Sequence, residues 1–268
     1  MSNHQAAPIG VFDSGVGGLS VVREMFLQLP RESFVYFADT AHVPYGGRSP
    51  EEIKGFSFGI TRFLLQQGCK MIIIACNTTN SVAYQDLIEA FDIPFIGVIE
   101  PGVDKALQTT KNGRVGLIAT EATVNSGFYQ QMLKSKNPAV KVMAKACPLF
   151  VPCVEKGETE GEAIRQAAKQ YLAPILAEDA DTLVLGCTHY PFLLPLLQRL
   201  TGRVVTFVDP AKETVKRARE RLEADGLLND SAQVQHRFFV SGDPVSFARI
   251  GGLFLEREIE QVEKISLE

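Results

Sequence analysis

Two stretches decide the fold: IIIACNTTNS at residues 72–81 and LVLGCTHYPF at residues 183–192. Each begins with a short apolar run typical of a buried strand and continues with a small residue, a cysteine and polar residues that open a helix. The cysteines, Cys76 and Cys187, stand 111 residues apart, as their strands do. This repetition predicts two similar structural units in one chain.

Further apolar runs extend the repeat in both directions. Helical patterns alternate with these runs, which is typical of parallel α/β sheets. The first and second halves correspond at offsets of 105 to 111 residues. We therefore predict two similar parallel-sheet α/β domains related by pseudo-twofold symmetry. The strands are expected at residues 9–12, 34–38, 71–75, 95–99, 115–119, 140–144, 182–186 and 204–208.

The connections carry clear signals as well. Ser49, Pro50 and Glu52 predict a capping box at the start of a helix that Gly68 ends. An acidic residue and a proline follow the fourth strand of each half, at 100–101 and 209–210. The segment after residue 209 adds helical patterns at 211–224 and 244–255 and a strand at 234–240. It is too short for a third domain, so it should pack on one of the other units.

Composition excludes several classes of protein. The 268 residues carry 27 basic and 31 acidic side chains, a net charge of −4, which gives no electrostatic footprint for nucleic acid. The six-residue apolar run at 71–76 is far shorter than the roughly 20 residues of a membrane span. Residues 1–7 lack the features of a secretory signal, and five cysteines cannot all pair. We expect free thiols in a reducing, cytoplasmic compartment.

The predicted chemistry lies at the carboxyl ends of the strands, where α/β sheets bind ligands. Two facing units would place one thiol on each side of a shared cleft. One thiolate could then remove a proton from a carbon while the other thiol returns one to the opposite face. A helix start next to each sulfur predicts a lowered thiol pKa. The polar residues at these ends are Asp13, Ser14, Asp39, Asn77, Thr78, Thr79, Thr120, Thr123, Thr188 and His189, with Glu155 in a later connection.

The same residues also allow structural roles, and two other patterns resemble cofactor or metal sites. A buried cysteine near a strand end is often only a small apolar side chain, and Ser, Thr and Asn often serve as helix caps. The glycines at 15–18 imitate a dinucleotide fingerprint, but Ser20 replaces its third glycine and Asp13 would repel a pyrophosphate. Cys147 and Cys153 lack the spacing and the second pair of a metal site. We expect no cofactor and no metal.

Four motifs occur together: GVFDSGVGGLSV (10–21), DTAHVPYGGRS (39–49), ACNTTNS (75–81) and LGCTHYP (185–191). With them the chain resembles the cofactor-independent glutamate racemases of the aspartate/glutamate racemase superfamily. The resemblance implies interconversion of L- and D-glutamate, which supplies D-glutamate for peptidoglycan. It also implies a first domain of residues 1–99 plus 210–268 and a second of 100–209, with the active site between them. We expect glutamate as the small-molecule partner, no nucleic acid or membrane partner, and a homodimer.

The resemblance also assigns roles to residues. Cys76 would deprotonate D-glutamate and Cys187 would deprotonate L-glutamate, assisted by Asp13, Asp39, Glu155 and His189. Aspartate racemase is the alternative within the superfamily, and a non-catalytic amino-acid-binding module with redox thiols is the alternative outside it. The implied substrate contacts are Asp13, Ser14, Pro44, Tyr45, Gly46, Asn77, Thr78, Thr120, Thr123, Thr188 and His189.

Overall fold

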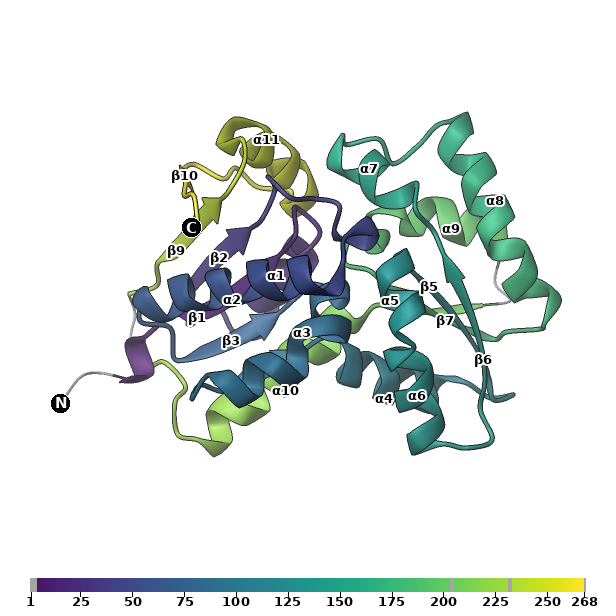
Figure 1. Cartoon of the computed structure of the whole chain (residues 1–268), viewed down its shortest axis with the longest axis horizontal. Helices are drawn as coiled ribbons and strands as arrows, with labels where there is room; N and C mark the ends of the chain where they lie inside the picture. The colour runs from purple at the N-terminus through teal and green to yellow at the C-terminus, as the bar shows by residue number, and fades with distance from the viewer. Residues whose placement is uncertain (1–3, 203–204, 231–232, 268) are drawn as a thin grey trace.

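A computed structural model describes residues 4–202, 205–230 and 233–267. Its strands form two separate parallel sheets (Figure 1). The first sheet contains β1 (Ile9–Asp13), β2 (Phe34–Ala38), β3 (Met71–Ile74), β4 (Phe95–Gly97), β9 (His236–Val240) and β10 (Val262–Lys264). The second sheet contains β5 (Arg114–Ala119), β6 (Lys141–Ala146), β7 (Thr182–Gly186) and β8 (Thr206–Val208).

Helices connect the strands along the whole chain. The α-helices are α1 (Leu19–Gln28), α2 (Pro50–Gln66), α3 (Asn77–Ala90), α4 (Ile99–Thr109), α5 (Glu121–Ser126), α6 (Phe128–Lys136), α7 (Phe150–Glu155), α8 (Glu162–Ala177), α9 (Leu194–Thr201), α10 (Pro210–Ala224) and α11 (Pro244–Leu255). Three short 3₁₀ helices are η1 (His4–Ala6), η2 (Tyr45–Gly47) and η3 (Tyr190–Leu193). Among the described residues, no helix combines the length and apolar character needed to cross a membrane.

The strand order repeats between the two sheets. The first sheet runs β10-β9-β2-β1-β3-β4 and the second runs β6-β5-β7-β8. The order β2-β1-β3-β4 thus corresponds to β6-β5-β7-β8, and every pairing is parallel. The predicted fold class of two parallel-sheet α/β units is confirmed. Cys76 follows β3 and Cys187 follows β7, so the two thiols stand at equivalent strand ends.

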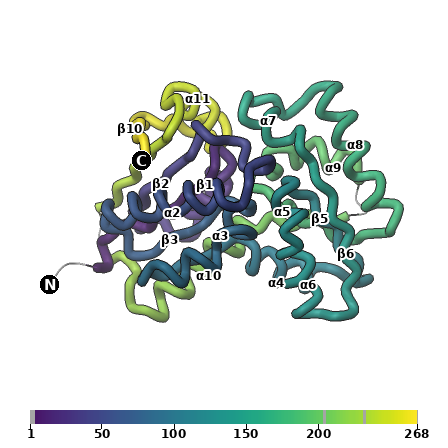
Figure 2. The backbone as a smooth tube through the Cα atoms, in the orientation of Figure 1, coloured from purple at the N-terminus to yellow at the C-terminus, as the bar shows by residue number. Residues whose placement is uncertain are grey.

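The last part of the chain completes the first sheet. Figure 2 shows the chain leaving the first body, building the second, and returning to the first through α10. Strand β9 then pairs in parallel with β2, so that Val240 lies opposite Ala38. As predicted, this segment packs on another unit instead of forming its own.

Side chains alternate between the two faces of the first sheet, as the period of two in a strand requires. Val11, Tyr36 and Ile73 face a core that α1, α10 and α11 cover, whereas Phe12 and Phe37 face a core that α2 and α3 cover. The first of these cores continues into the second sheet, because the same cluster contains buried residues of α4, β5 and β7. The two sheets therefore share apolar packing and hold their strand ends in fixed relation.

Several predicted boundaries were wrong by a few residues. Strand β4 stops at Gly97 because the side-chain Oδ1 of Asn80 accepts the backbone N–H of Ile99 at 2.8 Å, and α4 begins there. Strand β9 begins at His236, two residues later than expected, and the short strand β10 was not predicted. Its three residues are mostly exposed and carry no apolar pattern. Val204, at the predicted start of β8, lies outside the described residues.

The capping box predicted at residue 49 is confirmed. The Ser49 hydroxyl accepts the N–H of Glu52 at 3.3 Å, and the Glu52 carboxylate accepts the N–H of Ser49 at 3.0 Å. We expect Ser49→Ala to lower the free energy of unfolding by about 1 kcal/mol, since it removes a cap acceptor. Urea denaturation measures this change. Ser135→Ala is the matched control, because the exposed Ser135 hydroxyl donates to the carbonyl of Met132 and accepts no N–H at a helix start; an equal loss in both variants would contradict the capping role.

Candidate active site

Adjacent strands of the first sheet end in Asp13, Asp39 and Cys76. Strand β1 lies between β2 and β3, and the register continues past the strands. The N–H of Asp39 donates to the carbonyl of Asp13 at 3.0 Å, and the N–H of Ala75 donates to the carbonyl of Phe12 at 3.0 Å. All three side chains are nearly fully buried. The strand-end positions that the sequence indicated are therefore neighbours in space.

The second sheet meets this row at the end of β7. The hydroxyl of Thr188 donates to Oδ2 of Asp13 at 2.9 Å, a bond between residues 175 apart in sequence. The other oxygen of Asp13 accepts the N–H of Gly15 at 2.9 Å. Burial raises the pKa of Asp13, although the charge of His189 and these two hydrogen bonds oppose the rise. The carboxyl ends of the two sheets thus face each other across Asp13.

The glycines after β1 allow side chains of the second unit to approach the backbone closely, which explains them without a nucleotide-binding site. A Cβ at Gly15 would collide with the Glu155 carboxylate, and a Cβ at Gly17 would collide with the His189 ring. The backbone N–H of Val16 donates to Oε1 of Glu155 at 2.9 Å. Residues without side chains let the second unit touch the backbone of this loop.

His189 lies between a carboxylate and a thiol. Its Nε2 lies 2.6 Å from Oε1 of Glu155, and its Nδ1 lies 3.6 Å from Sγ of Cys187. The ring is 1% exposed. Burial lowers the pKa of His189, but hydrogen bonds and charge attraction from Cys187 and Glu155 outweigh it and raise the pKa well above 6.5. An imidazolium at this distance stabilises the thiolate form of Cys187.

Cys76 has different surroundings from Cys187. It caps the N-terminus of α3, and its Sγ accepts the N–H of Thr79 at 3.5 Å. The prediction of a lowered thiol pKa was wrong, although the hydrogen bond from the N–H of Thr79 at this helix start acts in that direction. Burial raises the pKa of Cys76 to about 12, and the negative charges of Asp13 and Cys187 add to the rise. At neutral pH Cys76 is therefore a protonated thiol.

The helix expected directly after Cys187 is not an α-helix. The 3₁₀ helix η3 starts at Tyr190, and α9 starts only at Leu194. Pro195 lacks an N–H, so it suits the first turn of a new helix and not the interior of a longer one. No α-helix therefore begins at Cys187, whose thiol instead contacts the ring of His189.

Most predicted contact residues gather between the two sheets. The hydroxyls of Thr78, Thr120 and Thr123 form a triangle with O–O distances of 2.9, 2.9 and 3.3 Å. Asn77 accepts a hydrogen bond from the hydroxyl of Tyr129 at 2.6 Å. These groups come from α3 on one side and α5–α6 on the other. The predicted substrate-contact residues that are buried here are Ser14, Asn77, Thr78, Thr120, Thr123, Thr188 and His189.

The loop after β2 contains the remaining predicted residues. Gly46 passes close to Thr120, and Pro44 follows a cis peptide bond. Tyr45 is buried and forms a small cluster with Ile53 and Cys76. Asp39, expected to assist a thiol, instead uses its carboxylate to bind Tyr45 and other groups on the far side of the loop. Tyr45 thus contacts Asp39 through its hydroxyl and shares a buried cluster with Cys76.

Three residues with polar contacts here were not predicted from the sequence. The Tyr36 hydroxyl donates to the carbonyl of Gly15 at 2.8 Å, and the Tyr129 hydroxyl binds Asn77. Ser241 donates to Asp39 at 2.6 Å. Tyr36 lies in the apolar run of β2, and Tyr129 lies near the start of α6 with no motif around it, so neither carries a sequence signal. Ser241 follows strand β9, so extending the strand-end rule to the last strand of the sheet would have found it.

Comparison with known proteins gives a consistent result. The family model described as "Asp/Glu/Hydantoin racemase" matches residues 9–218. A glutamate racemase of Corynebacterium diphtheriae is 47% identical over 261 residues, which cover 97% of this chain and 98% of that protein. The structure of glutamate racemase isoform RacE1 from Bacillus anthracis superposes with a TM-score of 0.94, at 40% identity and 98% coverage of both chains. That of glutamate racemase from Francisella tularensis, solved in complex with D-glutamate, gives 0.92 at 38% identity, covering 98% of this chain and 99% of that one.

Proposed function

Because the chain belongs to the Asp/Glu/Hydantoin racemase family, we propose that it interconverts L- and D-glutamate with Cys76 and Cys187 as the two acid–base groups. The single observation that carries the proposal is the contrast between the two thiols. They occupy equivalent strand ends, yet Cys76 is a protonated thiol beside Asp13, whereas Cys187 faces the imidazolium of His189. Racemisation needs one base and one acid at the same moment, and this contrast supplies both.

The reaction begins with the Cys187 thiolate when L-glutamate is bound. The thiolate takes the Cα proton, and the electron pair of the C–H bond moves into Cα and the adjoining carboxylate. The Cys76 thiol then gives its proton to the opposite face of Cα. The products are D-glutamate, a Cys187 thiol and a Cys76 thiolate, so the protons balance. D-Glutamate reacts by the reverse sequence, in which Cys76 is the base.

Asp13 and His189 assist this exchange by their charges. The imidazolium of His189, supported by Glu155, holds the negative charge on Cys187 between turnovers. Asp13 disfavours a second thiolate at Cys76, since its negative charge raises the pKa of that thiol. The pair therefore ionises one sulfur at a time.

Hydroxyl and amide groups between the sheets are suited to hold the substrate. Carboxylates are acceptors of hydrogen bonds, and hydroxyls, side-chain amides and backbone N–H groups at a helix start are donors. We assign the substrate carboxylates to Ser14, Asn77, Thr78 and Thr188, with Thr120 and Thr123 completing the threonine triangle. The loop of Pro44, Tyr45 and Gly46 would close over the substrate from the first unit.

The wider role is part of the same proposal. The D-glutamate formed would supply peptidoglycan synthesis in the cytoplasm. Each chain would have one domain of residues 1–99 plus 210–268 and a second of residues 100–209. Two copies of the chain would form a homodimer. Size-exclusion chromatography with light scattering tests the dimer, and a mass near 29.4 kDa would contradict it.

Solvent deuterium incorporation tests the activity itself. Purified protein in D₂O, without added cofactor, is expected to racemise L-glutamate and to place deuterium at Cα of the product. Circular dichroism follows the inversion, and proton NMR follows the exchange. Aspartate is assayed beside glutamate, since faster turnover of aspartate would favour the alternative substrate. Tight glutamate binding with no α-proton exchange would instead indicate a binding module.

A further inference from the structure

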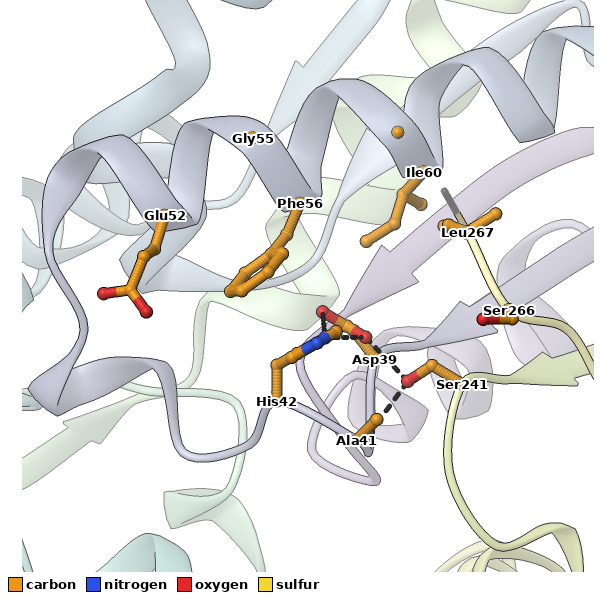
Figure 3. A pocket seen from close by; sticks show the side chains of 11 residues that line it. Asp39, Ala41, His42, Glu52, Gly55, Phe56, Ile60, Ser241, Ser266 and Leu267 are labelled. Carbon is orange, nitrogen blue, oxygen red and sulfur yellow. Dashed lines mark hydrogen bonds and ion pairs between the residues drawn. The ribbon is translucent and has the colours of Figure 1, made fainter.

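The carboxylate of Asp39 is held by a residue 202 positions later in the chain. Ser241 follows β9, the strand next to β2, and its hydroxyl donates to Oδ1 of Asp39 at 2.6 Å. The same hydroxyl accepts the backbone N–H of Ala41 at 2.9 Å, and the N–H of Ser241 donates to the carbonyl of Ala38 at 3.1 Å. Three bonds thus tie Ser241 to the end of β2 and the turn after it, and Figure 3 shows the two that the hydroxyl forms with Asp39 and Ala41.

The other oxygen of Asp39 binds the loop after β2. Oδ2 accepts the hydroxyl of Tyr45 at 2.5 Å, and Nδ1 of His42 lies 2.8 and 2.9 Å from the two oxygens. Burial and the charge of Asp39 raise the pKa of Tyr45 well above 10, so its hydroxyl stays a donor to Asp39. The Tyr45 ring belongs to the buried cluster of Ile53 and Cys76. Ser241, Asp39 and Tyr45 therefore form a chain of contacts that ends beside Cys76.

A cavity lies next to Asp39 and its partners. The cavity has a volume of about 450 Å³ and borders Asp39, His42 and Ser241, with Phe56 and Ile60 of α2 and Leu267 among its apolar lining. Figure 3 shows the Asp39 carboxylate at the floor of this space, with Ser241 on one side and His42 on the other. On the side that borders this cavity, the contacts with Tyr45, His42 and Ser241 fix the direction of the Asp39 carboxylate.

We propose that Ser241 is a positioning residue for the half-reaction of Cys76: by orienting Asp39 it holds Tyr45 against the cluster that contains this thiol. The inference rests on the two-thiol function proposed above. It assigns no contact with substrate to Ser241. Its consequence is one-sided, because Cys187 is supported by His189 and Glu155 of the other unit and does not depend on Asp39.

Ser241→Ala is expected to lower kcat by about tenfold, with a smaller change in KM, because two hydrogen bonds to the Asp39 turn are lost. The rate alone does not locate the slowed step. The two enantiomers have equal free energy, so kcat/KM stays equal in both directions for every variant. The primary isotope effect does locate it: [2-²H]-D-glutamate, deprotonated by Cys76, should show a larger effect than in the wild type, and [2-²H]-L-glutamate a smaller one.

Two variants complete the experiment. Ser266→Ala is the matched control, since Ser266 lines the same cavity and is expected to keep wild-type kinetics when its hydroxyl is removed. Ser241→Thr retains the hydroxyl and should restore most of the rate, with isotope effects near those of the wild type. Thermal unfolding of each variant checks that the fold is intact.

The outcomes separate the possibilities. Equal kinetics for Ser241→Ala and Ser266→Ala would overturn the proposal, as would a lower kcat with isotope effects unchanged or shifted equally for both enantiomers. Wild-type protein without glutamate racemisation would overturn the proposed function itself. That measurement comes first and does not involve Ser241.

Discussion

Replacing Cys76 or Cys187 with serine is expected to lower kcat for glutamate racemisation by about 10³-fold, the range typical of losing a general acid or base. Serine keeps the size and a polar atom at each position, so the loss reports chemistry and not packing. A hydroxyl is a far weaker acid than a thiol, and no group near either sulfur would make it an alkoxide. Both variants should fail in both directions, since each turnover uses one sulfur as base and the other as acid.

Circular dichroism measures the inversion, with L- and D-glutamate as separate starting materials. Cys69→Ser is the matched control: Cys69 is also buried, its thiol pKa is raised to about 12 by burial, and it lies beside Gly10 and Leu64, away from the strand ends. The control is expected to keep wild-type kcat per folded molecule. Wild-type turnover in either Cys76→Ser or Cys187→Ser would refute the two-thiol mechanism.

The repeat within the chain was sufficient to predict the fold. Apolar runs with matching offsets predicted two sheets, and the observed strand orders β2-β1-β3-β4 and β6-β5-β7-β8 correspond strand by strand. The same repeat placed both cysteines at strand ends. Short elements such as β10 escaped prediction, because three half-exposed residues have no hydrophobic period to detect.

Electrostatics at the site could not be predicted from the sequence, because they depend on burial by distant segments. A helix start favours a thiolate, yet burial beside Tyr45 and Ile53 raises the pKa of the Cys76 thiol. The direction of the Asp39 carboxylate was equally hidden, since its partner Ser241 lies 202 residues away. Local motifs therefore indicated candidate reacting groups, whereas their charge depends on tertiary contacts.

His189→Gln is expected to lower kcat/KM by about 10²-fold, because it removes the cation that stabilises the Cys187 thiolate. Glutamine keeps a hydrogen-bond donor near Glu155 but carries no charge. The slowed step is the one that uses Cys187. The primary isotope effect with [2-²H]-L-glutamate should therefore increase, whereas that with [2-²H]-D-glutamate should decrease, the opposite of the pattern expected for Ser241→Ala.

The pH profile gives an independent measure of the same group. The pKa of His189 in the folded protein is raised above 6.5, so the imidazolium is fully present at and below that pH and is lost as the pH rises through the raised value. Wild-type kcat/KM should consequently fall on the alkaline side, and His189→Gln should lack this limb. His236→Gln is the control: His236 lies in β9, its ring stacks on Phe34 of β2, and partial burial lowers its pKa to about 4, so it is neutral throughout. Among the described histidines, only His189 has a raised pKa and also contacts Cys187. If His189→Gln kept the alkaline limb of the wild type, the limb would belong to another group.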